Sequence, residues 1–327
     1  MHKSPFSCTL HKTKQYHVIT LSYCPTPKRE KPITVSIAPE LGSNMFSLTY
    51  GNDEIIVHKK ALLEKRGFTG NFVLFPTPNR VKNFTYTWSN KRIVLKKRGK
   101  IVEIHGLVYD EPWKYGNPHI ENDCATVRTW IDIDKRSPLF EAFPFPCRLT
   151  LTYALTPKGV QITYTVKNLG NQKLPFGFAL HPYFARLSGN DKTFISVPAK
   201  SWMESPKDTL LPTGKLISVA GKPYDIRKPV AVGTLDVDHV YTHLTPERFA
   251  TIQYAKQRIM VTLKTSKDFT HVVVYTGDPN AVCIENQTCS TDAHNLAERG
   301  LSNISHLLVV PPHKSHTGYI TYEVASC

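Results

Sequence analysis

Two side chains suited to acid/base chemistry, a histidine and a glutamate, lie in stretches whose pattern predicts β-strands. The first stretch, LPFGFALHPYF, contains His181. Side chains alternate between the faces of a strand, so Gly177 and Ala179 share the face of His181 and would leave space beside the imidazole. Pro182 has no N–H to continue a ladder and is expected to end the strand. A pocket is therefore predicted beside His181, and a histidine satisfied inside the core is the simpler alternative.

The second stretch, AVCIENQT, has Glu285 in the middle of a predicted strand. Cys283 and Gln287 would share its face, whereas Val282 and Ile284 would point the other way. Burial raises the pKa of a carboxyl group because it disfavours the charged form, and a raised pKa suits a general base. A glutamate on the solvated face of an edge strand is the simpler alternative.

Strand-like patterns extend over most of the 327 residues, in runs such as ITVSIA, CRLTLTYAL and VQITYTVKNL. Gly, Pro, Asn and Asp separate these runs, as is typical of an all-β sandwich or barrel. Helical patterns are few: VHKKALLEKRG, and STDAHNLAERG with Ser, Thr or Asp as a possible N-cap. No linker or repeat divides the chain, so we expect a single domain over residues 1–327.

Cysteine usage and hydropathy predict where the protein is found and what it binds. The seven cysteines have no paired spacing, the N-terminus lacks an apolar signal core, and no apolar run reaches membrane-spanning length. We therefore expect a cytoplasmic protein with reduced thiols and no membrane partner. The fourteen histidines show no HExxH or zinc-ribbon spacing, and no glycine-rich phosphate loop occurs, so neither a metal nor a cofactor is expected.

The chain is basic, with a net charge of +15 from 41 Lys and Arg against 26 Asp and Glu. Residues 82–100 contain seven basic side chains and no acidic one. A hairpin of this composition could attract nucleic acid, anionic lipid or a phosphorylated substrate, although a solvated hairpin is the simpler alternative. No RNA-recognition, zinc-finger or helix-turn-helix motif accompanies it, so no nucleic-acid partner is expected.

Three further stretches place polar side chains where they could meet a ligand. FPTPNRV sets Asn79 and Arg80 after two prolines in a stiff loop. KIVEIHGLVYDEPW is expected to be a strand that carries His105 before it turns. LDVDHVYTHL puts Asp236 and Asp238 on the same face of a short extended run.

In sequence order these motifs are NR, HG followed by a Trp, HPYF, an extended Asp segment and IENQT, with DA a few residues later. The series resembles the aldose 1-epimerase (galactose mutarotase) family, from about residue 33 to residue 325. The resemblance implies a large antiparallel β-supersandwich, an isomerase that interconverts α and β anomers of a free aldohexose, and chemistry without metal or cofactor.

The resemblance also implies a role for each candidate residue. His181 would be the general acid that protonates the ring oxygen, and Glu285 the general base that takes the proton of the anomeric hydroxyl. Both pKa values would then be drawn toward neutrality. The substrate-binding residues would be Asn79, Arg80, His105 and Asp238, with Asp236 as the alternative to Asp238.

Two loops depart from the family pattern and leave the substrate open. Residues 311–314 read Pro-Pro-His-Lys where many members have a Pro-Gly-Glu turn, and residues 289–292 contain no proline. The alternatives are a hexose-6-phosphate mutarotase and a non-catalytic carbohydrate-binding protein on the same fold. Either a monomer or a homodimer is compatible with the sequence.

Overall fold

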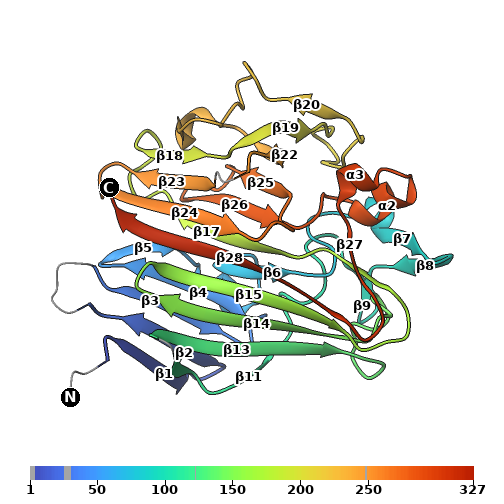
Figure 1. Ribbon diagram of the computed structural model, residues 1–327, viewed down its shortest axis with the longest axis horizontal. Helices are drawn as coiled ribbons and strands as arrows, with labels where there is room; N and C mark the ends of the chain where they lie inside the picture. Colours follow the sequence, from blue (N-terminus) through green and yellow to red (C-terminus); the bar gives the residue numbers. More distant parts are fainter. Residues whose placement is uncertain (1–3, 26–30, 122, 247–248) are drawn as a thin grey trace.

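The computed structural model describes residues 4–25, 31–121, 123–246 and 249–327, and its regular structure is almost entirely antiparallel β-sheet (Figure 1). Two large sheets, of twelve and ten strands, make up most of the molecule. The chain order of the strands differs from their order in each sheet, so segments far apart in sequence become neighbours.

The strands of the first sheet lie in the following order: β1 (Phe6–Lys12), β2 (His17–Tyr23), β3 (Ile33–Ala38), β4 (Asn44–Tyr50), β5 (Asp53–Ile56), β17 (Ala179–Ala185), β26 (Ala281–Gln287), β25 (His271–Tyr275), β22 (Asp238–Leu244), β19 (Ala199–Met203) and β20 (Leu216–Ser218). β6 (Asn71–Leu74) also pairs with β17.

The second sheet runs in the order β11 (Lys114–Tyr115), β13 (Cys124–Ile133), β14 (Cys147–Thr156), β15 (Gly159–Asn168), β28 (Ser315–Ser326), β24 (Ile259–Thr265), β23 (Ala250–Tyr254), β18 (Thr193–Ser196) and β21 (Val230–Ala231). β12 (His119–Glu121) also pairs with β13.

Three small pairs and a few short helices complete the fold. The pairs are β7 (Thr85–Trp88) with β8 (Lys91–Val94), β9 (Lys96–Lys97) with β10 (Lys100–Ile101), and β16 (Leu174–Phe176) with β27 (Leu308–Val310). The α-helices are α1 (Lys60–Glu64), α2 (Ala293–Glu298) and α3 (Ser302–Ser305), and the 3₁₀ helices are η1 (Lys82–Phe84) and η2 (Val232–Thr234).

Side-chain alternation explains how the sheets form a sandwich. In β14, Leu149, Leu151 and Tyr153 are buried, while the residues between them are partly exposed. Buried side chains from both large sheets join one hydrophobic cluster, and β2 packs against β13 and β14. Each fully buried Val, Leu or Ile side chain contributes about 1.5–3 kcal/mol to the free energy of folding. The prediction of a large antiparallel β-sandwich is confirmed.

The prediction of a strand through His105 is wrong. Only Lys100 and Ile101 of that stretch are in a strand, and His105 and Gly106 have φ values of 66° and 75°. The left-handed conformation takes this backbone out of the extended path. A side chain on Gly106 would collide with the Phe75 backbone, so glycine is required at this turn.

The single strand expected over LPFGFALHPYF is in fact two. β16 ends at Phe176 and belongs to a small sheet, and β17 begins at Ala179 in a large one. Pro182 does not end β17, because Tyr183 donates its N–H to Gly70 and pairing with β26 resumes there. His181 therefore lies inside a strand.

Both expected helices are present as α1 and α2. Asp292 directly precedes α2, but its side chain does not cap the helix. One carboxylate oxygen instead accepts hydrogen bonds from the backbone N–H of Lys82 and from the Asn295 side chain. Asp292 thus links α2 to the segment that follows Arg80 through hydrogen bonds.

Acid is expected to destabilise the fold through its buried histidines. Burial lowers the pKa of His181, His271 and His294 to about 3 and that of His105 well below its usual value. An unfolded histidine titrates near pH 6.5. Between about pH 6.5 and pH 3 the unfolded chain therefore binds protons that the folded chain does not, and stability falls as pH falls.

His271→Gln isolates one of these contributions, because the buried carboxyl groups titrate alike in both proteins. Between pH 6.5 and pH 4.5, the variant should lose less unfolding free energy than the wild type, by about 1.4 kcal/mol per pH unit. Urea unfolding at a series of pH values measures this difference. Equal pH slopes for the two proteins would show that His271 does not stay neutral in the folded state.

Candidate active site

One pocket of about 260 Å³ brings together all six side chains expected at the site from the sequence. Three come from the strands β17, β26 and β22, and the other three from the loops near residues 79 and 105. The six are Asn79, Arg80, His105, His181, Asp238 and Glu285, and the other lining residues are Phe68, Ile104, Tyr183 and Tyr275.

His181 and Glu285 face each other across the neighbouring strands β17 and β26. Ala179 lies opposite Gln287 and Tyr183 opposite Cys283, and the same register puts His181 across from Glu285. Nε2 of His181 is 3.2 Å from Oε1 of Glu285. The two side chains are nearly inaccessible to solvent, with residue exposures of 5% and 2%.

Burial acts on both members of this pair. It lowers the pKa of His181 to about 3. It also raises the pKa of Glu285 well above its usual value, an effect that the negative charge of Asp238 increases and a hydrogen bond from Gln287 opposes. The expectation that both pKa values approach neutrality thus agrees in direction for Glu285 and is wrong for His181, because the isolated imidazolium is too costly to bury.

The electrostatics of the pair favour a neutral imidazole next to a protonated carboxyl group. This state contains the same number of protons as an imidazolium next to a carboxylate. The two states differ only by the transfer of one proton between Nε2 of His181 and Oε1 of Glu285. The pair can therefore exchange one proton without any change in its net charge.

Backbone contacts hold the loop that supplies Asn79 and Arg80. Asn79 has a φ of 61°, and its side-chain oxygen accepts a hydrogen bond of 3.1 Å from the guanidinium of Arg80. The carbonyl of Asn79 accepts the N–H of His105, and the carbonyl of Arg80 accepts the N–H of Asp292, both at 2.9 Å. Hydrogen bonds therefore hold the 79–80 loop to two segments distant in sequence, those of His105 and Asp292.

His105 lies edge-on to His181, with 5.0 Å between the ring centres. Phe68 and Phe72 pack around its ring. Burial, together with the positive charges that His181 and Arg80 can carry, keeps the pKa of His105 well below its usual value. His105 is therefore neutral, and its buried Nδ1 has no hydrogen-bond partner among the described residues.

The structure distinguishes the two aspartates that the sequence left open. Asp238 is the first residue of β22, lies opposite Tyr275 and lines the pocket. Burial raises the pKa of its carboxyl group, and Arg80 opposes this effect. Asp236 precedes the strand and is exposed.

The sequence did not single out the apolar walls of the pocket. Tyr183 could have been found, because it lies two residues after His181 on the same face of β17. Tyr275 could be found only once β25 and β22 were known to pair. Phe68, in the loop after α1, gives no signal in the sequence.

Comparison with known proteins shows the family of this chain. The family model described as aldose 1-epimerase matches residues 29–323. The chain belongs to the aldose 1-epimerase family. A galactose mutarotase from Sus scrofa is 26% identical over 181 residues, which cover 53% of this chain and 49% of that protein. The chain thus matches about half the length of this curated relative.

Solved structures of family members share the fold. A galactose mutarotase-like protein from Clostridium acetobutylicum superimposes with a TM-score of 0.84 at 21% identity, covering 99% of this chain and 100% of that one. A galactose 1-epimerase from Lactobacillus acidophilus gives a TM-score of 0.78 at 14% identity, covering 99% of both chains.

In the present chain, the space that the sequence predicts beside Gly177 and Ala179 on the face of His181 is filled by other residues. A side chain on Gly177 would collide with Cys289 and Pro78. Ala179 packs in a small cluster with Phe72. The small residues therefore allow close packing of the chain, and the pocket at His181 is lined instead by Asn79, Arg80 and Asp238 of β22, among others.

The basic stretch at residues 82–100 is partly neutralised by acidic residues later in the chain. The Lys97 ammonium contacts the carboxylates of Asp110 and Glu111, and Arg98 forms a two-pronged ion pair with Glu111 at 2.6 and 2.7 Å. None of the seven basic residues lines the pocket.

The described part of the chain lacks two features that would point to another class of protein. It contains no group of three or more His, Cys, Asp or Glu side chains arranged to bind a metal ion. None of its helices is long and apolar enough to cross a membrane. All seven cysteines fall within the described residues, and none is in a disulfide.

Proposed function

We propose that this protein interconverts the α and β anomers of a free, uncharged aldohexose. The observation that carries the proposal is the 3.2 Å contact between His181 and Glu285, buried at the base of a pocket with hydroxyl-binding groups. Opening a cyclic hemiacetal requires one proton for the ring oxygen and removal of one from the anomeric hydroxyl. A pair that shares one proton can supply both transfers.

In the ring-opening step, the Glu285 carboxylate takes the proton of the anomeric hydroxyl while the His181 imidazolium gives its proton to the ring oxygen. The bond between C1 and the ring oxygen breaks, and C1 becomes an aldehyde. Afterwards Glu285 is protonated and His181 is neutral, which is the state that burial favours. Rotation about C1–C2 and closure on the other face of the aldehyde reverse both transfers.

The other polar groups of the pocket would hold the sugar. The Arg80 guanidinium donates hydrogen bonds, the Asp238 carboxylate accepts them, and the neutral His105 ring can do either. Phe68, Tyr183 and Tyr275 offer apolar surfaces to the C–H groups of a pyranose ring. These contacts fix the ring so that its two oxygens face the acid/base pair.

The charge of the pocket favours a neutral substrate over a hexose 6-phosphate. Arg80 is the only lining Lys or Arg in the described chain, and it faces the carboxyl groups of Asp238 and Glu285. A dianionic phosphate would require several cations at this rim. A protein that only bound sugar would gain nothing from a buried pair able to exchange a proton, which counts against the non-catalytic alternative.

Glu285→Gln keeps the size of the side chain but cannot take a proton, so mutarotation should slow by about 10²–10⁴-fold. His181→Asn should have a similar effect, and the double variant should be little worse because the two residues act as a unit. Polarimetry of freshly dissolved α-D-glucose and α-D-galactose measures the rate. Glu323→Gln, outside the pocket, is the matched control, and near wild-type rates in Glu285→Gln would refute the mechanism.

Asp238→Asn should raise KM by about tenfold or more, because it removes the charge from a hydrogen-bond acceptor for sugar hydroxyls. Asp236→Asn makes the same chemical change two residues away on the surface and should leave KM unchanged. Initial rates over a range of sugar concentrations compare the two variants. A larger KM effect for Asp236 than for Asp238 would contradict the placement of the sugar beside β22.

The pH dependence of kcat/KM should show that the His181–Glu285 pair is active only when the two residues share one proton. A second proton inactivates the pair at low pH, and loss of the shared proton inactivates it at high pH. The lowered pKa of His181 and the raised pKa of Glu285 move these limits apart. The plateau of kcat/KM should therefore be wider than the roughly two pH units between ordinary Glu and His values, with the acid limb toward about pH 3.

The pH profile is measured by polarimetry after subtraction of the spontaneous rate. The alkaline limb belongs to Glu285 in this scheme and should vanish from the residual activity of Glu285→Gln. A single imidazole-like step near pH 6.5 would instead show that His181 titrates independently of its partner.

A further inference from the structure

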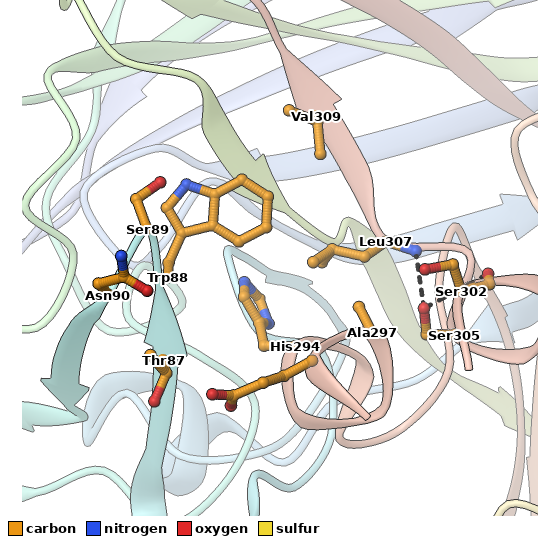
Figure 2. Close-up of a pocket in the computed structure, with 11 residues that line it drawn as sticks. Thr87, Trp88, Ser89, Asn90, His294, Ala297, Ser302, Ser305, Leu307 and Val309 are labelled. Carbon is orange, nitrogen blue, oxygen red and sulfur yellow. Dashed lines mark hydrogen bonds between the residues drawn. The ribbon is translucent and has the colours of Figure 1, made fainter. Parts of the chain in front are cut away.

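A second pocket, of about 360 Å³, lies between the β7–β8 hairpin and the helices α2 and α3 (Figure 2). It shares no lining residue with the catalytic pocket. Figure 2 shows the Trp88 indole on one side, Leu307 on the other, and the His294 ring between them. The volume is within the usual range for small-molecule sites.

The pocket contains a buried polar side chain, His294, that makes no hydrogen bond of regular geometry within the described part of the chain. His294 is only 2% exposed, and neither ring nitrogen has a hydrogen-bond partner among the described residues. Its ring stacks obliquely on Tyr86 at 4.1 Å, and the buried Tyr86 hydroxyl also has no partner there. Buried donors and acceptors in folded proteins are normally paired. The unpaired ring nitrogens of His294 therefore indicate a hydrogen-bonding partner from outside the protein.

The protonation state of His294 defines what that partner must offer. Burial lowers its pKa to about 3, and a weak polar contact with the Pro175 backbone carbonyl, outside regular hydrogen-bond geometry, opposes this effect. The ring is therefore neutral and presents one N–H donor and one nitrogen acceptor. Hydroxyl groups are the natural complement, because each can both accept and donate a hydrogen bond.

Trp88 presents an apolar surface to the same space. Its indole N–H is already bonded to the Lys173 carbonyl at 3.2 Å, so the rings meet the pocket without a free polar group. The next two residues, Ser89 and Asn90, have φ values of 49° and 62°, as in a tight two-residue hairpin turn. This turn places two short polar side chains at the rim beside the indole (Figure 2).

Charge excludes most other ligand classes. The described residues that line the pocket include no Lys or Arg, which argues against phosphates and carboxylates. Glu298 is the only charged lining side chain, and it is exposed. A suitable ligand is therefore uncharged, has several hydroxyl groups and has one apolar face, and a pyranose ring has all three properties.

We propose that this pocket is a second carbohydrate site, which binds a neutral pyranose with its C–H face on Trp88 and its hydroxyl groups on His294. The site is separate from the catalytic pocket and needs no ring opening. The dissociation constant should be on the order of 1 mM, as expected for a ligand of monosaccharide size.

Equilibrium dialysis with radiolabelled methyl α-glycosides of glucose, galactose and xylose tests this proposal. Methyl glycosides cannot open their rings, so binding is measured without turnover. Ala297→Phe fills the pocket from α2 and should remove one bound sugar per chain, while mutarotation of glucose continues. Ala61→Phe makes the same change on the exposed face of α1 and should bind as the wild type does.

Two further variants make the result decisive. Trp88→Leu should also remove this sugar, and Asp238→Asn should weaken only binding in the catalytic pocket. The proposal is overturned if none of the three glycosides binds, or if Ala297→Phe and Trp88→Leu both bind as the wild type does. It is also overturned if Asp238→Asn abolishes all binding, since the sugar would then occupy only the catalytic pocket. Loss of mutarotation in Glu285→Gln tests the proposed reaction and is independent of these outcomes.

Discussion

The contact between His181 and Glu285 is the constraint on which the site depends. The two residues are far apart in sequence, and only the adjacency of β17 and β26 brings their side chains together. Moving outward in the same sheet, β25 and β22 come next and contribute Tyr275 and Asp238. Four neighbouring strands thus supply His181, Glu285 and one wall of the pocket, so the sheet order determines the geometry of the pocket.

The burial of His181 and Glu285 limits the charges that the pair can carry. A lone imidazolium or carboxylate at these positions would be strongly disfavoured, as the shifts of both pKa values show. One proton shared between the two residues avoids a net buried charge in either arrangement. Asp238 and Arg80 lie beside the pair and interact with each other, so the pocket offers both hydrogen-bond donors and acceptors.

The sequence predicted the parts of the site that follow from strand periodicity. His181, Glu285 and Asp238 lie in alternating runs, and these runs are strands. Periodicity could not predict the loops: His105 has a left-handed backbone conformation where its N–H bonds to the Asn79 carbonyl and the next residue, Gly106, packs against the Phe75 backbone. It also could not reveal whether the space beside a small residue is occupied, which depends on the approach of distant segments such as that of Cys289.

The N-terminal end of helix α2 contacts segments of both pockets. The residue before it, Asp292, donates its N–H to the Arg80 carbonyl and accepts that of Lys82. Two residues later, His294 faces the second pocket, and Asn295 bonds to the start of β7. The start of this short helix therefore borders both the segment that carries Arg80 and the hairpin that carries Trp88. Because the helix has less than two turns, these contacts involve most of its first turn.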